Sequence, residues 1–470
     1  MNSSTMFTLA QIQHWLPAGK IVGALDTQIT GISTDSRTVK PGDLFIALKG
    51  ERFDAHAFLP QVQQKGAAAV LVSQAIACDL PQIQVSDTRV ALCELAAKWR
   101  SRFDLPLVLV LGSNGKTTVK EMIAAIFCQA VGSSHYLATV GNYNNDIGLP
   151  LSLLKLNQQH QLAVIELGMN HPGETAMLAH IAQPTVVLIN NAQREHQEFM
   201  NTVEAVAQEH ASALDSLTPQ GIAVFPADSP YQSLWRQRAQ PRRIIDFALD
   251  GPATISGHTI SVTNSHSSIN IKIPQEQITV TLSALGTHNL HNALAACAAC
   301  YAVNINPHTI KLGLENFVPT KGRLHIIPDT TLTVIDDSYN ANPDSVRAAI
   351  DVLAQMPGPR TLVLGDMGDV GLHGIDFHIE VGNYAKANKI NLLIGVGPLS
   401  QHSCDAFGYD SQHFADTQAL CQQLQIGKIA IQGTVLVKGS RFMRMEQVIP
   451  LLQHNVSQQS SPDKKGGLCS

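Results

Sequence analysis

The sequence predicts an α/β protein of three domains, with a doubly wound, mostly parallel sheet in the central one. The chain has 470 residues, which is more than one hydrophobic core usually serves. From about residue 85 onward, short apolar segments of strand length alternate with segments of helical periodicity. One apolar segment runs directly into a glycine-rich loop that opens a helix. Such alternation is typical of parallel sheets that carry helices on both faces.

The first predicted domain covers residues 1–84. Helical patterns span residues 9–16 and 59–65, and the apolar segment 68–72 has the length of a strand. Short strands and turns fill the remainder, so we expect a small α/β unit.

The second predicted domain covers residues 85–319. Its expected parallel strands are the apolar segments 107–111, 163–167, 185–189 and 221–225. Residues 252–284 differ, because polar and apolar residues alternate there. Alternation favours strands with one face toward solvent, so we expect a small antiparallel appendage.

The third predicted domain covers residues 320–456. Its expected strands are the segments 332–335, 361–364, 391–394 and 434–437, again separated by helical patterns. Residues 457–470 are polar and rich in Gly and Ser, and we expect them to form a disordered tail.

Composition excludes several classes of function. The net charge is −5, and no basic block exceeds a pair, so we expect no nucleic-acid partner. The first residues lack a basic and apolar leader, and no later segment approaches the length of a membrane span. We therefore expect a cytoplasmic protein without membrane insertion. A monomer is our expectation for the oligomeric state, which the sequence does not show. Cys297 and Cys300 have the spacing of a metal pair, but their alanine-rich helical surroundings favour small core residues.

The most informative segment is residues 105–118. An apolar strand enters the loop Gly112-Ser113-Asn114-Gly115, and a helix begins with Lys116-Thr117-Thr118. The glycines allow the backbone to approach a polyphosphate, and the helix N-terminus directs its amides and the positive end of its dipole toward it. Lys116 would neutralise phosphates, and the Thr117 hydroxyl would hold Mg²⁺. An ordinary glycine-rich turn is the alternative, which the flanking strand and helix disfavour.

Polar residues follow other predicted strands directly. Glu166 ends one strand, and His196 follows the next by a short loop. Ligands bind at the carboxyl ends of strands in open α/β sheets. Together with Thr117, these side chains would suit Mg²⁺, which prefers hard oxygen ligands and substrate phosphates. Singly, Glu166 could cap a turn and His196 could be an ordinary surface residue.

An asparagine-rich loop covers residues 141–150. Amide side chains supply hydrogen-bond donors and acceptors without charge, which suits the orientation of a polar substrate. An ordinary turn cluster is an equal alternative. The asparagines concerned are Asn142, Asn144 and Asn145.

Two further segments have functional character. His288 and Asn292 lie one turn apart at the start of a helical pattern. Arg323 follows a glycine at the predicted boundary of the third domain. If the domains close, this arginine could stabilise charge on a transferring phosphoryl group; the alternative is a salt bridge at a hinge.

With these segments assembled, the chain resembles the Mur ligases over nearly its whole length. Thr34-Asp35-Ser36-Arg37 with residues 41–48 is similar to the family's uridine-nucleotide segment, residues 112–121 to its ATP loop, and residues 141–150 to its substrate loop. Residues 337–343, 365–368 and 437–441 resemble the branch of the family that uses D-alanyl-D-alanine.

The resemblance implies a set of site residues. Those expected to bind ATP are Gly112, Ser113, Asn114, Gly115, Lys116, Thr117, Thr118, His288, Asn289, Asn292, Arg323 and Asp337. Those expected to bind the other substrates are Ser36, Arg37, Asn142, Asn144, Asn145, Asn340, Asn342, Lys438, Ser440 and Arg441. Thr117, Glu166 and His196 are the expected metal ligands, and Lys116, Arg323 and His210 the expected catalytic residues.

The resemblance also implies an activity. It is the ATP-dependent, Mg²⁺-dependent addition of D-alanyl-D-alanine to UDP-N-acetylmuramoyl-tripeptide through an acyl phosphate, in peptidoglycan precursor synthesis. The domains would be a uridine-nucleotide-binding α/β domain, a P-loop ATPase-like domain and a Rossmann-like ligase domain. The alternatives are another amide ligase of the same family, a P-loop NTPase of a different class, and a nucleotide-sugar-binding protein without catalysis.

The chain departs from the family at Ala55, where glycine is usual, at Asp369, where glutamate is usual, and most seriously after His196. The resemblance implies a lysine on the helix after His196, carbamylated by CO₂, whose carboxylate helps to hold a second Mg²⁺. Here His210 stands at that position, and residues 156–271 contain no lysine. We expect His210 to act through a water or a hydrogen bond. The alternatives are direct metal binding by His210, metal binding by Glu209, and a site organised without the second metal ion. Activity should then be independent of bicarbonate.

Overall fold

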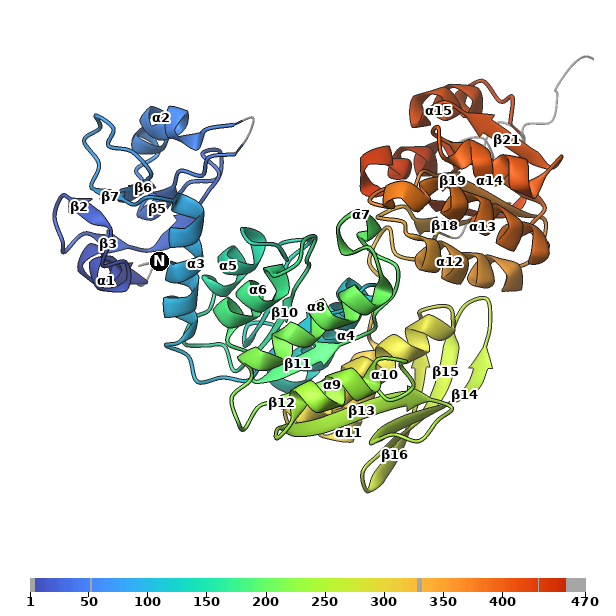
Figure 1. The fold of residues 1–470 in the computed structure, drawn as a ribbon, viewed down its shortest axis with the longest axis horizontal. Helices are drawn as coiled ribbons and strands as arrows, with labels where there is room; N and C mark the ends of the chain where they lie inside the picture. Colours follow the sequence, from blue (N-terminus) through green and yellow to red (C-terminus); the bar gives the residue numbers. More distant parts are fainter. Residues whose placement is uncertain (1–4, 51–52, 328–331, 430, 454–470) are drawn as a thin grey trace, which may run out of the picture.

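The computed structural model describes residues 5–50, 53–327, 332–429 and 431–453. These residues form three α/β units that follow one another along an elongated molecule (Figure 1). The predicted tail, residues 457–470, lies outside the described residues, and the exact domain bounds near residues 85 and 320 remain predictions.

The N-terminal unit contains a two-stranded and a five-stranded sheet. The predicted helices are confirmed as α1 (Leu9–Trp15) and α2 (Leu59–Gln64), and the predicted strand as β6 (Ala69–Val72). Thr8 begins α1 in a reciprocal capping arrangement with Gln11. The small sheet pairs β1 (Phe7–Thr8) with β3 (Gln28–Ile29), and the other has the order β2 (Lys20–Val22), β7 (Gln82–Gln84), β6, β5 (Asp43–Ile46), β4 (Gly31–Ser33).

Helix α3 (Thr88–Arg100) joins this unit to the next. Asp87 begins it by accepting hydrogen bonds from the amides of Arg89 and Val90. Its apolar face is fully buried, and its last turn places Trp99 beside Phe7 of the first unit, with 5.7 Å between ring centroids. One hydrophobic cluster therefore runs from the N-terminal sheet through α3 into the central domain.

The central domain is built on a nine-stranded sheet. Its first six neighbouring pairs, from β9 to β14, are parallel. The spatial order is β16 (Glu276–Leu282), β15 (Ser267–Ile273), β14 (Ile255–Val262), β13 (Arg243–Leu249), β12 (Ile222–Pro226), β11 (Val186–Ile189), β8 (Leu107–Leu111), β10 (Leu162–Glu166), β9 (Tyr136–Ala138). The four strands predicted here are confirmed within one residue at each end.

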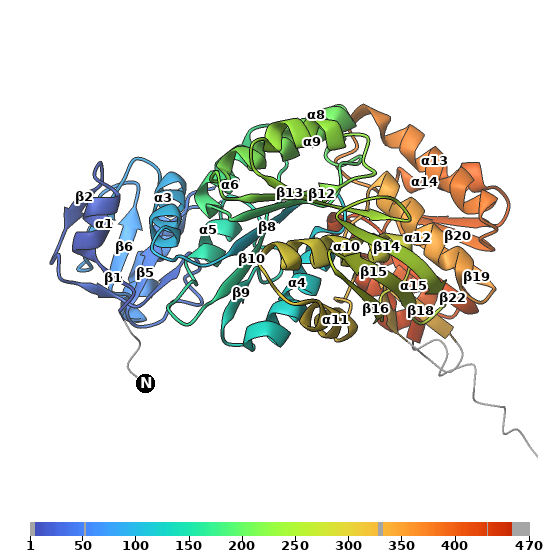
Figure 2. The same ribbon diagram turned by 90° about the horizontal axis from the view of Figure 1, so that it is seen from below.

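Residues alternate between two cores along β8. Leu107, Leu109 and Leu111 belong to one hydrophobic cluster, whereas Val108 and Val110 belong to the cluster on the opposite face. Figure 2 shows helices on both faces, which confirms the doubly wound arrangement. One face carries α5 (Gly148–Leu153), α6 (Glu174–Ala182), α8 (Val203–Ser212) and α9 (Gln232–Ala239), and the other α4 (Lys116–Val131), α10 (Thr287–Ala302) and α11 (Pro307–Glu315).

The expected antiparallel appendage is partly wrong. The strands β14, β15 and β16 are antiparallel to one another, as predicted. However, β14 pairs in parallel with β13, so these strands extend the central sheet instead of forming a separate element. Their inward residues, such as Ile269 and Ile271, are buried beneath α10. The alternation revealed the solvent-facing side but not the edge to which the strands attach.

Helix α10 lies in the hydrophobic core of the central domain, which explains its apolar composition. Cys297 and Cys300 are fully buried in it, and burial raises the pKa of the Cys297 thiol to about 12. This confirms the prediction that the pair consists of small core residues. No helix among the described residues is long and apolar enough to cross a membrane.

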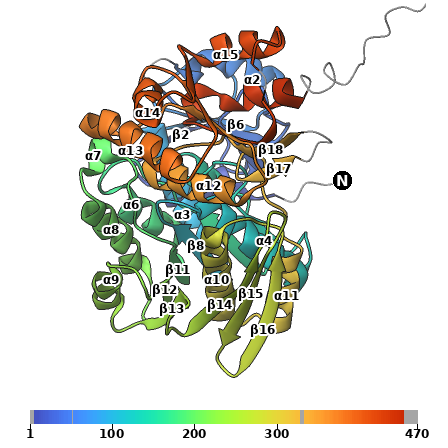
Figure 3. The ribbon, with the colours of Figure 1, turned by 90° about the vertical axis from the view of Figure 1, so that its right-hand side faces the viewer.

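The C-terminal unit has a six-stranded sheet. All four predicted strands are confirmed there: β18 (Leu332–Asp337), β19 (Arg360–Gly365), β20 (Leu392–Val396) and β22 (Gly433–Lys438). The order is β17 (His325–Ile327), β18, β22, β19, β20, β21 (Ser411–Phe414), covered by α12 (Pro343–Gln355), α13 (Gly374–Ala387), α14 (Ser400–Phe407) and α15 (Thr417–Gln425). Figure 3 shows this unit above α10 and α4.

Candidate active site

A cleft of about 690 Å³ lies between the central and C-terminal units, at the carboxyl ends of the central strands. Residues far apart in sequence line it together. The predicted residues found there are Ser113, Asn114, Gly115, Lys116, Thr117, Thr118, Asn142, Asn144, Asn145, Glu166, His196, His288, Asn289, Asn292, Arg323, Asp337, Asn340, Asn342, Lys438 and Arg441. Those not lining it are Ser36, Arg37, Gly112, His210 and Ser440.

The loop of residues 112–115, called the phosphate loop below, connects β8 to α4. Gly112 and Gly115 have φ values of 137° and 81°, which side chains with a Cβ rarely adopt. A Cβ on Gly115 would also lie only 2.4 Å from Asn292 Oδ1. The loop is held from behind by Asn191, whose Oδ1 accepts from the Asn114 amide at 2.9 Å. The predicted glycine positions are therefore required by both conformation and space.

Lys116 is folded back onto its own loop. Its Nζ donates to the Gly112 and Ser113 carbonyl oxygens, and it lies 3.2 Å from Glu195 Oε2. The opposite oxygen of Glu195 lies 3.2 Å from His210 Nε2. Burial alone would raise the pKa of Glu195, but Lys116 and His210 hold it well below its ordinary value. Glu195 is thus an ionised carboxylate inside the protein.

Thr117 and Glu166 contact each other at the strand ends. The Thr117 hydroxyl donates to Glu166 Oε1 at 3.2 Å, and Asn144 Nδ2 donates to the same oxygen at 2.7 Å. Glu166 Oε2 is buried without a hydrogen-bond partner. An unpartnered carboxylate oxygen beside a hydroxyl fits Mg²⁺, which takes such ligands together with phosphate oxygens. Within the described ranges, no three His, Cys, Asp or Glu side chains are grouped closely enough to hold a metal ion.

Arg323 reaches the same hydroxyl from the C-terminal side. Its Nη2 donates to Thr117 Oγ1 at 2.8 Å, and its guanidinium lies 4.2 Å from the centroid of the Tyr339 ring. The backbone turns into this position at Gly322, where φ is 77°. Arg323 is therefore placed where a phosphate held by the loop would lie.

His196 faces the C-terminal unit. Its Nδ1 lies 3.1 Å from Asp369 Oδ2, and the Glu198 amide donates to the Asp369 carbonyl. A carboxylate at Nδ1 favours the tautomer that leaves Nε2 free to bind a metal ion.

The start of α10 presents amides and an imidazole to the cleft. Asn190 donates to Asn292 at 2.9 Å, and Asn292 donates to Asn289 at 2.9 Å. Burial, with Lys438 and His291 nearby, lowers the pKa of His288 to about 4. His288 is therefore neutral at neutral pH and can contact a nucleotide base without carrying charge.

The C-terminal strand ends contribute a buried ion pair. Lys438 Nζ lies 2.6 Å from Asp337 Oδ2 and donates to the Asn340 carbonyl at 2.9 Å. Ser440 instead supports the backbone, since it accepts from the Gly368 amide and donates to the Ala341 carbonyl. Its hydroxyl does not face the cleft, so direct substrate binding by Ser440 stays a prediction without geometric support.

Ser36 and Arg37 lie in the N-terminal unit, away from the cleft. The Arg37 side chain is 83% exposed and pairs with Asp35 at 2.6 Å. Arg37 in turn lowers the pKa of Asp35 to about 2. An exposed, charged guanidinium is available to a ligand of the N-terminal unit.

Glu209 does not approach the cleft. Its carboxylate accepts from the Gly173 and Thr175 amides and so stabilises the start of α6. The alternative that Glu209 binds the metal ion is therefore wrong. Sequence reasoning missed Glu195, a buried residue that lines the cleft and has no motif of its own. Its only signal was its position beside His196, after a strand end.

Comparison with known proteins identifies the family of this chain. Family models match in order along the chain: the Mur ligase family catalytic domain over residues 28–100, the Mur ligase middle domain over residues 110–300, and the Mur ligase glutamate ligase domain over residues 322–441.

Individual relatives span almost the whole chain. It is 41% identical over 452 residues, 95% of this chain and 98% of the relative, to the UDP-N-acetylmuramoyl-tripeptide--D-alanyl-D-alanine ligase of Escherichia coli K12. The fold is similar to a crystal structure of MurF from Acinetobacter baumannii, with a TM-score of 0.89, 33% identity, and coverage of 95% and 99% of the two chains. It is also similar to MurF from Thermotoga maritima in complex with ADP, with a TM-score of 0.79, 24% identity, and coverage of 91% and 98%. The chain belongs to the Mur ligase family.

Proposed function

We propose that this chain is an ATP-dependent ligase that adds D-alanyl-D-alanine to UDP-N-acetylmuramoyl-tripeptide, with a new C–N bond. The observation that carries the proposal is the convergence on Thr117 of Glu166 from the central sheet and Arg323 from the C-terminal unit. The specific substrates follow from the relatives, since the E. coli relative is named for this reaction. ATP is supported further by the ADP bound to the T. maritima neighbour.

The reaction must first activate a carboxylate. The terminal carboxylate of the tripeptide attacks the γ-phosphorus of ATP, giving an acyl phosphate and ADP. The free amine of D-alanyl-D-alanine then attacks the acyl carbon, phosphate leaves, and the amine loses its proton. Phosphoryl transfer of this kind depends on positioning and on dispersal of charge.

The residues of the cleft fit these needs. Lys116 and Arg323 supply positive charge on two sides of the phosphate loop. Thr117 and Glu166 would hold Mg²⁺, which would neutralise phosphate charge when bound. The neutral His288 and the amides of Asn289 and Asn292 would contact the adenine base. Asn142, Asn144, Asn145, Asn340, Asn342, Lys438 and Arg441 would orient the tripeptide and the dipeptide.

The N-terminal unit would bind the uridine nucleotide through Ser36 and Arg37. Support comes from the exposed guanidinium of Arg37 and from the coverage of this unit by the relatives. We place the enzyme in the cytoplasm as a monomer, where ATP and UDP-linked precursors are available. Its product would enter peptidoglycan synthesis and thereby wall biogenesis, cell shape and division.

A substrate panel tests the proposal. Phosphate release is measured with ATP, Mg²⁺, UDP-N-acetylmuramoyl-tripeptide and each of several dipeptides, and D-alanyl-D-alanine should stimulate it most. L-alanyl-L-alanine is the matched control. No stimulation by D-alanyl-D-alanine would remove the proposed substrate, and phosphate release without any acceptor would favour an NTPase of another class.

A further inference from the structure

Glu195 is a buried carboxylate that lines the cleft. The residue is 6% exposed and lies between Lys116, on the side of the phosphate loop, and His210 on α8. Its Oε1 has no partner of good hydrogen-bond geometry, although His210 Nε2 is 3.2 Å away. Buried carboxylates are costly unless they are paired. In this arrangement Lys116 supplies the pairing charge.

That pairing conflicts with the proposed contact between Lys116 and a phosphate. Its three protons are directed to the Gly112 carbonyl, the Ser113 carbonyl and Glu195, so none is left for a phosphate. When Lys116 turns toward a polyphosphate, Glu195 loses its lysine partner and keeps only the contact with His210 while it remains buried. A buried carboxylate left in this way requires a replacement cation.

Carboxylate oxygens of the cleft would supply part of the ligand set of a divalent cation, with phosphate oxygens of the nucleotide supplying the rest. Glu166, in the same cleft, has a buried oxygen without a partner, and His196 is the next residue in the chain. No lysine occurs between residues 156 and 271, so a carbamate cannot form on α8. In place of a lysine carbamate, the side chain of Glu195 supplies a carboxylate next to His210.

We propose that Glu195 is a ligand of a second divalent cation that binds together with the nucleotide, and that His210 is a positioning residue that orients this carboxylate. The inference rests on the proposed function, because it assumes that the phosphate loop binds ATP. It keeps the expectation that His210 acts through a hydrogen bond and replaces the two alternatives in which His210 or Glu209 binds the metal ion directly.

Counting bound metal ions tests this directly. The full chain is titrated with Mn²⁺ in the presence of a non-hydrolysable ATP analogue and the UDP-tripeptide, and free Mn²⁺ is followed by electron paramagnetic resonance. We expect two ions per parent chain. Glu195→Gln, which removes the charge and keeps the shape, should bind one ion tightly and the second at least about tenfold more weakly. Two ions bound with parental affinity would overturn the proposal, as would a single ion in the parent.

Three further variants sharpen the count. Glu198→Gln removes an exposed carboxylate only three residues away and should retain both ions. His210→Gln keeps an N–H near the place of Nε2 and should retain the second ion better than His210→Ala; equal affinities would refute the positioning role. If Glu195→Gln does not fold, the bound Mn²⁺ ions are counted in Glu195→Asp, which has a shorter side chain. Parental affinity for both ions in that variant would overturn the proposal.

Two other measurements separate this inference from the proposed function. Removing CO₂ and adding bicarbonate should leave the parent's rate unchanged, whereas a rate restored by bicarbonate would mean that a lysine supplies the carboxylate and would refute the role of Glu195. Failure of the proposed function would appear in the substrate panel as the absence of stimulation by the dipeptide. The metal count of Glu195→Gln does not depend on which acceptor is used.

Discussion

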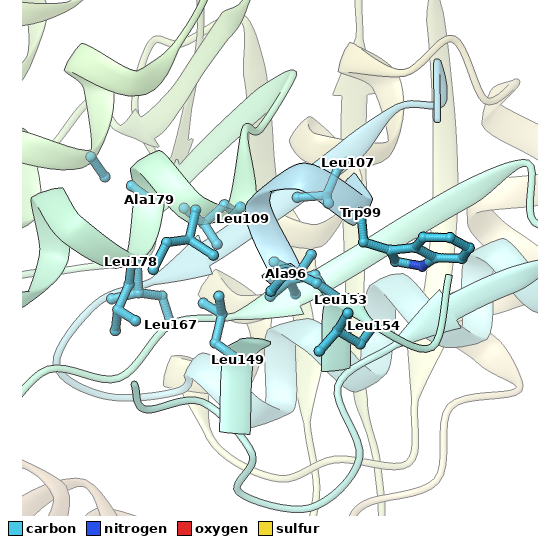
Figure 4. Close-up of a cluster of buried hydrophobic side chains, with 14 of the residues drawn as sticks. Ala96, Trp99, Leu107, Leu109, Leu149, Leu153, Leu154, Leu167, Leu178 and Ala179 are labelled. Carbon is cyan, nitrogen blue, oxygen red and sulfur yellow. The ribbon is translucent and has the colours of Figure 1, made fainter. Parts of the chain in front are cut away.

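The two joints between the three units differ in the chemical character of their contacts. The joint between the N-terminal and central units is apolar: Phe7 and Trp99 belong to one buried cluster that continues to Leu153 and Leu178 (Figure 4). The joint between the central and C-terminal units, called the polar joint below, carries ion pairs in addition to the apolar Leu285. Arg194 there contacts Asp344 and Glu380, each with an N–O distance of 2.6 Å.

The contrast indicates which joint can move. Apolar burial depends on excluding water, so opening the first joint would expose much of a core. Ion pairs near the surface have little net free energy, because water replaces the lost partner. The proposed ATP site lies at the second joint, and the proposed uridine-nucleotide site lies beyond the first. In this structure Arg323 already contacts Thr117, so the motion that remains to be tested is opening.

The largest effect is expected at the polar joint. Lys116→Ala should lower turnover at least about a thousandfold, because it removes the charge that we propose turns toward the transferred phosphate. It should also reduce the free energy of unfolding by about 1–3 kcal/mol, since it leaves Glu195 buried without its cation. Phosphate release and urea unfolding measure the two effects. The double variant Lys116→Ala/Glu195→Gln should recover part of the stability but none of the activity; equal stability of the single and double variants would refute this coupling.

The apolar joint should respond mainly in stability. Trp99→Ala should cost about 3–5 kcal/mol of unfolding free energy, because it removes a buried ring that contacts Phe7 and donates to the Leu156 carbonyl. Trp235→Ala is the matched control, since Trp235 is buried and hydrogen-bonded to Ala207 within the central domain. Only Trp99→Ala should expose the N-terminal unit to limited proteolysis. Equal protection in both variants would contradict a shared core.

A smaller effect is expected from the ion pairs of the polar joint. Arg194→Ala should cost roughly 1 kcal/mol or less in stability but should increase the radius of gyration in small-angle scattering without ligands. Arg238→Ala is the control, because Arg238 pairs with Asp215 inside the central domain. An ATP analogue with the UDP substrate should compact Arg194→Ala toward the parent. An unchanged radius in every sample would favour a preformed cleft.

A change in the N-terminal unit, beyond the apolar joint, should have the smallest effect on the proposed ATP site. Arg37→Ala should weaken binding of the UDP substrate about tenfold, in the range of one lost charged hydrogen bond, with the affinity for ATP unchanged. Calorimetric titration of each ligand measures both affinities. Equal losses would show that the two sites are not separate.

Sequence reasoning succeeded where a signal is local. The strands of the central and C-terminal sheets are apolar runs with ends marked by polar residues, and the phosphate loop is fixed by its glycines and by Lys116. It failed where partners are remote: Arg194 lies 150 residues from Asp344 and 186 from Glu380, and nothing in either segment specifies the other. Glu195 was missed for the same reason. Its importance arises only when folding brings Lys116 and His210 to opposite sides of it.

The start of α12 has an electrostatic consequence for the whole molecule. Asn342 caps this helix by accepting from the Ser345 amide, and it also donates to Asn114 in the loop that begins α4. The positive ends of two helix dipoles from different units therefore meet at one loop. Without an anion these ends repel each other, whereas a polyphosphate is attracted to both. The attraction between the units should accordingly increase with the negative charge of the bound nucleotide, in the order AMP, ADP, ATP.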